Sequence, residues 1–358
     1  MYWIGAIVAI GVLIVVHEAG HFFVARWCKM RVDRFSVGFG PAIWSRKTGD
    51  TIFQIAPIPF GGYVQINGML VADEIDPDDP HAYPNRPAWQ RFLTIFAGPA
   101  TNYLFAIVLA VVFFSVAGVE TNVRKYCEIR SIEPGSDAVG KLEKGDRIVG
   151  IELYDGDKLT YQGRLQKSLG TYVQIAKDNQ IKFRVERDGS DGVKSRMVTV
   201  HAHKVEAKDG STMYLIGVRH TELHERRDVG IFASVGYALY YPIDQTQQIV
   251  SGLFKVVTGE EKGELTGPVG ITSVIKDSIE AGWLSLVRLL MILNVYLGLF
   301  NLFPLPALDG GRLVFLGYEM ATRRRANPKV EATVHMVGIM ALLVVMVLVT
   351  YKDIAKLL

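Results

Sequence analysis

The sequence predicts an α-helical polytopic membrane protein with four transmembrane helices and a β-rich domain outside the membrane. Three observations predict this fold class. Of the 358 residues, 49% are hydrophobic, and the mean hydropathy is +0.22. The apolar residues gather in blocks, separated by stretches that have the composition of a soluble protein. Four blocks are long enough to cross a bilayer, which takes roughly 20 helical residues.

The four apolar blocks give the predicted spans. The first lacks a basic leading region and a small-residue cleavage site, and it contains Glu18. We therefore interpret it as a span rather than a signal peptide. The third is followed by a proline-rich turn, which we include in its segment. The four segments are residues 1–24, 92–119, 284–311 and 332–351.

Basic residues next to the spans predict the orientation of the chain. Cytosolic loops of membrane proteins carry an excess of Lys and Arg. Such residues cluster after the first span and again between the third and fourth, where Arg323, Arg324 and Arg325 are consecutive. Both loops are therefore predicted to face the cytosol. The two chain ends and the β-rich domain then lie on the outer side.

Charge and cysteine content exclude two other classes of protein. The formal net charge of +3 is small and gives no indication of nucleic-acid binding. Only two cysteines occur, Cys28 and Cys127, so a disulfide framework is excluded.

Three segments between the spans have a predicted structure of their own. The cytosolic loop, residues 25–91, contains two predicted strands, Thr51–Ile55 and Tyr63–Ile66, around a turn-rich stretch. Residues 124–205 show strand-like runs separated by turns and predict a small β-rich domain. Residues 229–259 predict an amphipathic outer helical segment. Two alternatives stay open for that segment, namely a helix on the membrane surface or a helix packed on the small domain.

The first span carries a metal-binding motif. His17-Glu18-Ala19-Gly20-His21 is an HExxH sequence. Residues four apart lie on one helix face, so His17 and His21 can bind the same metal ion, with Glu18 beside it as a base. Each ionised group at membrane depth costs about 2.5–3.5 kcal/mol on insertion scales. That cost favours a metal site over a buried, hydrogen-bonded histidine.

Asp309 is the candidate for the third ligand of a catalytic zinc, which leaves one position open. An Asp followed by two glycines is also typical of a turn that closes a helix. The topology favours the ligand, because the first and third spans run in the same direction and bring the motif and Asp309 to similar depth. Pro304 and Pro306 end the helix there, and free backbone at that depth is tolerated only in protein or beside a wet cavity.

Other polar residues receive weaker interpretations. Asn301 is expected to donate a hydrogen bond to the reacting carbonyl, whereas Asn294 and Asn102 suit hydrogen bonds between helices. His201 and His203 alternate along a predicted strand and are interpreted as a solvent-exposed pair. His335 is expected at the membrane interface.

With HEAGH in the first span and NLFPLPALDGG in the third, the chain resembles the site-2 protease family. The stretches FSVGFGP (35–41), PFGGYV (59–64), RPAWQR (86–91), AGPATN (97–102) and GPVGI (267–271) extend the resemblance over nearly the whole chain. The nearer resemblance is to the bacterial sigma-E regulator type, which carries a PDZ domain between its second and third spans. Some relatives carry two PDZ domains, whereas this chain has room for one.

The resemblance implies a site and a fold. It implies zinc bound by His17, His21 and Asp309, with Glu18 as base and Asn301 in substrate handling. It also implies a cytosol-side, membrane-associated β-hairpin around Gly61, Gly62 and Tyr63, where an unwound substrate adds a strand. Residues 124–205 would be an extracytoplasmic PDZ domain, and residues 229–259 an outer segment that acts as a gate.

The resemblance also implies a biological setting. The protein would lie in a bacterial cytoplasmic (inner) membrane, with its active site near the cytosolic side. Its substrates would be membrane proteins with a single transmembrane helix, such as anti-sigma factors or signal-peptide remnants, cut in regulated intramembrane proteolysis. A peptide C-terminus or another partner is expected at the PDZ domain.

Two other functions remain as alternatives. A membrane scaffold that contains zinc but cuts nothing would not need Glu18. A metal transporter would need ionisable residues along a whole path, whereas here they gather at one depth. Cleavage of a membrane-protein substrate that stops when zinc is chelated separates all three.

Overall fold

The computed structural model describes residues 2–69, 76–189, 192–206, 212–260 and 267–355. The chain divides into two compact units. The helical unit comprises Met1–Ala117 and Val229–Leu358, and the β unit comprises Gly118–Asp228. Each unit has its own buried core.

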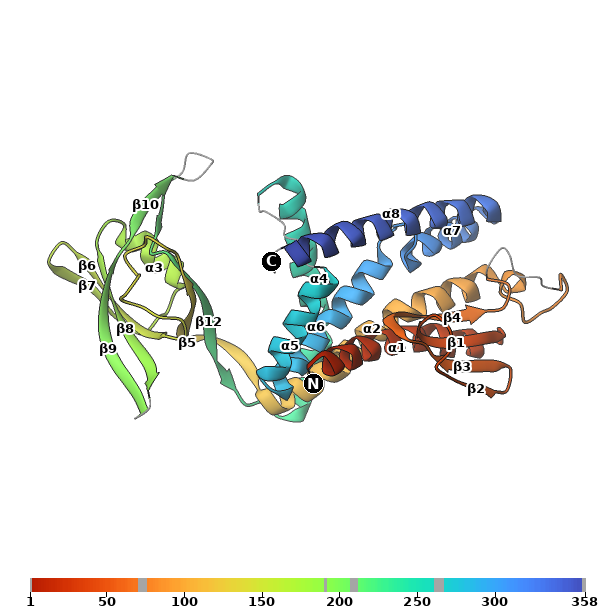
Figure 1. The fold of residues 1–358 in the computed structure, drawn as a ribbon, viewed down its shortest axis with the longest axis horizontal. Coiled ribbons are helices and arrows are strands. Elements are labelled where there is room, and N and C mark those ends of the chain that lie inside the picture. Colours follow the sequence, from red (N-terminus) through yellow and green to blue (C-terminus); the bar gives the residue numbers. More distant parts are fainter. Residues whose placement is uncertain (1, 70–75, 190–191, 207–211, 261–266, 356–358) are drawn as a thin grey trace. The chain divides into compact units, whose positions relative to one another are not determined.

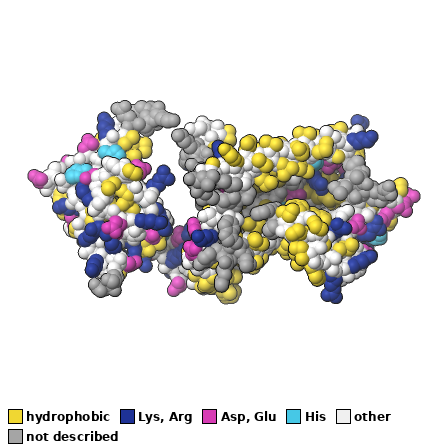
Figure 2. Space-filling model, in the orientation of Figure 1, with side chains coloured by type: hydrophobic (Ala, Val, Ile, Leu, Met, Phe, Trp, Pro, Cys, Tyr) yellow, Lys and Arg dark blue, Asp and Glu magenta, His cyan; other side chains and the backbone are white. Residues whose placement is uncertain are grey.

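Among the described residues, four helices of the helical unit are long and apolar enough to cross a membrane, the same number as the sequence predicts. Most of the predicted spans end a few residues before the helices do, because the helical backbone continues into the polar residues on either side of the apolar block. Apolar side chains cover much of the surface that this unit presents in Figure 2. The four helices are α1 (Tyr2–Trp27), α2 (Ala88–Ala117), α6 (Trp283–Leu302) and α8 (Pro328–Ala355).

The helical segment between the β unit and the third span is α4 (Ile231–Thr258). Its Ala238 packs with Ala110 of α2 and Met291 of α6. Its Ile249 packs with the same two helices in a second buried cluster. Neither expected location accounts for this buried face, because it packs against two of the spans. Figure 1 shows α4 alongside α6.

Two further helices were not predicted. Helix α5 (Pro268–Glu280) packs on α1 through Ile275, which contacts Ala6 and Ala9. Helix α7 (Asp309–Thr322) follows α6 after six intervening residues, which form the proline-rich turn. A short 3-10 helix, η1 (Tyr83–Asn85), precedes α2.

A four-stranded sheet joins α1 to α2, and it corrects the predicted hairpin. The sheet order is β2-β3-β1-β4, so the two predicted strands flank β1 instead of pairing with each other. Strand β1 pairs with β3 in parallel and with β4 antiparallel. The strands are β1 (Val32–Phe39), β2 (Trp44–Thr48), β3 (Thr51–Ile55) and β4 (Ile58–Ile66).

The physical reason lies at the link between β3 and β4. The backbone N–H of Ala56 donates to Val37 at the end of β1, so the link crosses that strand end instead of forming a tight turn. Gly38 has a φ of +91°, and a Cβ there would lie 2.5 Å from the Ala56 carbonyl oxygen. A glycine therefore allows the crossing.

In its described residues, the β unit is an antiparallel sheet with one helix, α3, and one buried core. The sheet order is β12-β5-β6-β8-β9, with β7 paired to β6. A separate pair, β10 and β11, follows β9 in the chain. The elements are β5 (Val119–Ile132), β6 (Arg147–Asp155), β7 (Lys158–Gly163), α3 (Leu169–Ala176), β8 (Gln180–Gly189), β9 (Gly192–His201), β10 (His203–Glu206), β11 (Thr212–Leu215) and β12 (Val218–Arg227).

The predicted domain, residues 124–205, is too short because it omits β12. This strand pairs with β5 along most of its length and completes the sheet. Its sequence, VRHTELHERR, has no apolar alternation, so only the pairing with a distant strand identifies it. His201 and His203 are exposed, as predicted, on either side of the buried Ala202.

Candidate metal centre

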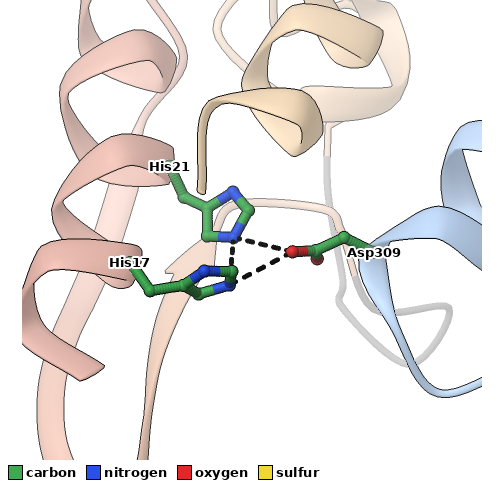
Figure 3. A group of neighbouring side chains, drawn as sticks. All are labelled: His17, His21 and Asp309. Atoms are coloured by element: carbon green, nitrogen blue, oxygen red, sulfur yellow. Dashed lines mark hydrogen bonds and ion pairs between the residues drawn. The ribbon is translucent and has the colours of Figure 1, made fainter. Parts of the chain in front are cut away.

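Two imidazoles of α1 meet the carboxylate that opens α7 (Figure 3). The Nε2 atoms of His17 and His21 lie 3.2 Å apart. Oδ2 of Asp309 lies 3.1 Å from Nε2 of His17 and 3.3 Å from Nε2 of His21. Asp309, which follows the histidines by 288 positions or more, therefore completes one compact triangle of potential ligand atoms with them.

This triangle has the size that zinc requires. Tetrahedral coordination with bonds of about 2.0 Å places neighbouring ligand atoms roughly 3.3 Å apart. The two histidines are 9% and 8% exposed, and Oδ2 of Asp309 is buried against their Nε2 atoms. A buried carboxylate is costly unless its charge is balanced, and a cation bound among the three atoms would balance it. The donor set of two imidazoles and one carboxylate leaves a fourth position free, as in catalytic zinc sites.

The sequence around Asp309 explains how the carboxylate reaches this point. Asp309 is the first residue of α7, so the Asp-Gly-Gly stretch begins a helix and does not close one. A Cβ on Gly310 would lie 2.0 Å from the carbonyl oxygen of Phe303, and one on Gly311 would lie 2.5 Å from that of Leu305. Only glycines allow α7 to begin this close to the end of α6.

Helix α2 orients both imidazole rings. Nδ1 of His21 donates to the carbonyl oxygen of Thr94 at 2.9 Å, which leaves the lone pair of Nε2 facing Asp309. The side-chain amide of Asn102 lies 2.9 Å from Nδ1 of His17, and its Oδ1 has no partner. If this amide is rotated by 180°, Oδ1 accepts a hydrogen bond from Nδ1–H of His17, and Nε2 of His17 is left unprotonated and free to bind a metal. Such outer hydrogen bonds are typical of metal-binding histidines.

A close approach of α2 to α1 makes these contacts possible. A Cβ on Gly98 would lie 2.3 Å from Nε2 of His21, and one on Gly20 would lie 2.3 Å from the carbonyl oxygen of Ala97. Thr101 also donates from Oγ1 to the carbonyl oxygen of Val16, across the two helices at 3.0 Å. The AGPATN stretch therefore forms one wall of the site.

Glu18 lies between the metal-binding side chains and the sheet. Its carboxylate is within electrostatic range of His17, His21 and Asp309, and it accepts a hydrogen bond from the backbone N–H of Val64. A Cβ on Gly62 would lie 3.3 Å from Cγ of Glu18. Strand β4 therefore passes directly beside the predicted base.

The other predicted substrate residues differ in their positions. Gly61 packs under the ring of Phe39, which a Cβ would approach to 2.1 Å. Tyr63 stacks on Phe39, and its hydroxyl accepts from Arg34 and Gln54, so its side chain belongs to the sheet. Asn301 donates to Leu297 within its own helix at 2.9 Å. The structure gives no contact of its side chain with the metal ligands.

Sequence reasoning missed two residues near the ligands. Asn102 was interpreted as a helix–helix contact. A polar group in an apolar span is costly, and that cost was the signal that could have pointed to its role beside the ligands. His335 was expected at the interface. It is 8% exposed and accepts at Nδ1 from the backbone N–H of Ala307, two residues before Asp309.

A second group of potential ligand atoms lies in the β unit, at Cys127, His220 and Glu222. Here the carboxylate is already occupied, because Glu222 accepts from Arg124 at 2.6 Å and from the backbone N–H of Leu169 at 3.1 Å. Burial raises the pKa of the Cys127 thiol to about 12, so it is protonated at neutral pH. A guanidinium and a protonated thiol oppose a cation, and we interpret this cluster as structural.

Fold and site together define a class of protein. The chain is a multi-pass membrane protein. Its span α1 carries two histidines with a glutamate beside them, and the turn after span α6 brings an aspartate to those histidines in an arrangement suited to zinc. That combination is characteristic of a membrane-embedded metalloprotease.

Comparison with known proteins identifies the family. Residues 5–345 match the model of peptidase family M50, so the chain belongs to that family, the site-2 proteases. A protein of Fusobacterium nucleatum subsp. nucleatum is 31% identical over 100% of this chain and 99% of its own length. A Brucella suis protein is 33% identical over 96% of this chain and 92% of its own length. A Staphylococcus aureus protein is 28% identical over 99% of this chain and 98% of its own length. Each is named "Putative zinc metalloprotease". The protein is a metalloprotease with zinc as its cofactor.

Proposed function

We propose that this protein hydrolyses peptide bonds within the transmembrane segments of single-span membrane proteins. One observation carries the proposal: the two histidines lie on a helix that is itself long and apolar enough to span the membrane. A protease with ligands on a spanning helix acts at membrane depth, and only segments that enter the bilayer reach it.

The residues have separate roles in this proposal. His17, His21 and Asp309 hold the zinc, and Glu18 takes a proton from the attacking water and passes it to the leaving amine. When bound, zinc acts as a Lewis acid that makes water acidic near neutral pH and polarises the scissile carbonyl. Asn301 donates a hydrogen bond to that carbonyl. This last role requires its side chain to leave the Leu297 carbonyl when substrate binds.

Strand β4 supplies a surface for the substrate backbone. It lies at one end of the sheet order, and no described strand pairs with its outer edge. The Val64 N–H on that edge points to Glu18. A helical substrate shields its peptide bonds with its own hydrogen bonds. Adding the unwound segment to β4 at Gly62 replaces those bonds and presents the chain to Glu18.

Figure 2 supports access from the side of the helical unit. The unit is hollowed between the part with α7 and α8 and the part with α1 and the four-stranded sheet, and charged side chains lie at the floor of the hollow. An unwound polypeptide needs such a polar passage, because its backbone cannot remain unpaired in lipid.

The orientation and regulation form the finer part of the proposal. We assign the active site to the cytosolic side of a bacterial inner membrane, with both ends and the β unit outside, and the basic residues of the loops support this orientation. We assign the β unit as a PDZ domain of the sigma-E regulator type that takes a peptide C-terminus. Anti-sigma factors and signal-peptide remnants are the substrate class, and nucleic acid is not a partner.

The test uses purified protein in lipid vesicles with a single-span substrate. We expect cleavage within the substrate's membrane segment and its loss when zinc is chelated. Glu18→Gln should abolish cleavage while zinc stays bound, because the ligands are untouched. Uncut substrate with full zinc content in the unaltered protein would favour a scaffold, and zinc flux across the vesicles would favour a transporter.

A further inference from the structure

The turn that delivers Asp309 contains a strained residue. Ala307 has a φ of +79°, a left-handed conformation that residues with a side chain rarely adopt. Such conformations persist where surrounding contacts enforce them, often at functional sites. Ala307 precedes Asp309 by two residues, so its backbone sets the direction in which the chain enters α7.

A side chain of the fourth span binds the backbone of this residue. Nδ1 of His335, on α8, accepts from the backbone N–H of Ala307 at 3.1 Å. Within the turn, Leu305 and Leu308 donate to backbone carbonyls of the turn itself. The Ala307 N–H is bound instead by a side chain 28 positions away in the sequence.

Close packing surrounds this hydrogen bond. One turn along α8, a Cβ on Gly338 would lie 2.3 Å from Cβ of Pro306, and a Cβ on Gly311 would lie 3.2 Å from Cε1 of His335. Most other side chains of α8 are exposed. The face formed by His335 and Gly338 is therefore a principal attachment of this span to the rest of the helical unit.

The histidine is not explained by packing alone. With Nδ1 accepting from Ala307, Nε2 carries the ring's proton, and Nε2 is buried without a partner among the described residues. An apolar side chain would fill the same volume without that cost. The useful atom is therefore the acceptor, Nδ1.

We propose that His335 is a positioning residue, which holds Ala307 in its left-handed conformation and so directs the carboxylate of Asp309 at His17 and His21. It acts through the backbone of the turn and touches neither the metal nor the substrate. This inference rests on the metal centre proposed above. It makes the fourth span part of the site, although α8 contributes no ligand.

Two near-matched substitutions test which ring nitrogen matters. His335→Asn places an amide oxygen where Nδ1 lies, whereas His335→Gln places its amide where Nε2 lies. The first readout is hydrogen exchange of the segment 303–311 in metal-free protein. We expect His335→Asn to resemble the unaltered chain. His335→Gln should speed exchange at Ala307 by about five- to tenfold, the effect of losing one hydrogen bond.

The second readout is zinc affinity, measured by competition with a chelator. We expect His335→Gln to weaken zinc binding by about 10- to 100-fold, as loss of an outer contact does, and His335→Asn to retain it. Adding Ala307→Gly to His335→Gln should restore part of the affinity, because glycine adopts the positive φ without a support. Elution as a monodisperse species and an unchanged helix content confirm that each variant is folded.

The outcomes separate this inference from the proposal beneath it. If His335→Gln binds zinc as tightly as the unaltered chain, or if Asn and Gln weaken it equally, the positioning role is wrong. If the unaltered chain binds no zinc at this site, the metal centre fails. The exchange rates of the metal-free variants then still decide whether His335 holds the turn.

Discussion

Asn102 shows what single residues contribute to the site. Its amide lies 2.9 Å from Nδ1 of His17, and with its Oδ1 turned toward that atom it accepts the Nδ1–H and leaves Nε2 free to bind zinc. The meeting of His17, His21 and Asp309 was predictable, because HExxH sits in an apolar span and Asp309 reaches the same depth. The hydrogen bonds of Asn102 and Thr94 to the histidines were not, because nothing in the sequence pairs them with particular rings 85 and 73 positions away.

Asn102→Ala should weaken zinc binding by about 10- to 100-fold, since the His17 ring loses its orienting partner. Asn102→Asp keeps an oxygen acceptor for Nδ1–H and should retain most of the affinity. Competition with a chelator measures both variants. Equal losses of zinc affinity in the two variants would contradict this role, because they would show that His17 requires the shape of the Asn102 side chain and not its oxygen acceptor.

Gly98→Ala should abolish zinc binding. The added Cβ would lie 2.3 Å from Nε2 of His21, within the space that a metal ligand needs. Gly11→Ala is the matched control. Gly11 lies in the same helix as the histidines, and nothing lies within 4 Å of a Cβ added there. Zinc content of the purified variants tests the pair, and zinc retained by Gly98→Ala would contradict the close approach of α2.

At the scale of elements, long apolar runs were predictable and pairings between distant strands were not. The four spans follow from hydropathy alone. The place of β1 between β3 and β4 depends on where the chain crosses at Ala56, and β12 is too polar to stand out as a strand. Helices α5 and α7 were missed because glycine-rich sequence at their starts is typical of turns.

Asp353 stabilises one of these unpredicted helices. It is 9% exposed on α8 and accepts from the backbone N–H of Gly270 in the first turn of α5, at 2.9 Å. Asp353→Ala should lower the free energy of unfolding by about 1 kcal/mol, the usual effect of removing an N-terminal cap. Asp353→Asn keeps an acceptor and should cost less. Thermal unfolding in detergent compares them, and equal stability of Ala and Asn variants would exclude a capping role.

At the scale of the whole molecule, the two units have separate cores. In the β unit, Asp146 is fully buried and accepts two hydrogen bonds from Arg187, at 2.6 and 2.8 Å. Burial alone would raise the pKa of Asp146. The hydrogen bonds from Arg187 and the Glu143 backbone outweigh burial and hold this pKa below its ordinary 3.8.

A carboxyl group whose pKa is lowered by folding stabilises the folded state above its unfolded pKa, and that stability is lost as pH falls through the folded pKa. The unfolding temperature of the β unit should therefore decrease as the pH falls below about 3.8. Asp146→Asn should flatten this dependence and leave zinc content at neutral pH unchanged. Asp155→Asn, at the exposed end of β6, is the control. Calorimetry of the full chain tests this, and an acid dependence unaltered in Asp146→Asn would contradict it.

X-ray absorption at the zinc edge of the purified protein tests the central claim most directly. The structure predicts one zinc per chain, bound by nitrogen and oxygen atoms at about 2.0 Å, with two imidazoles in the first coordination sphere. In Asp309→Asn the zinc content should fall. A sulfur ligand, or full zinc occupancy in a variant that lacks His17 and Asp309, would contradict the assignment of His17, His21 and Asp309 as the metal site.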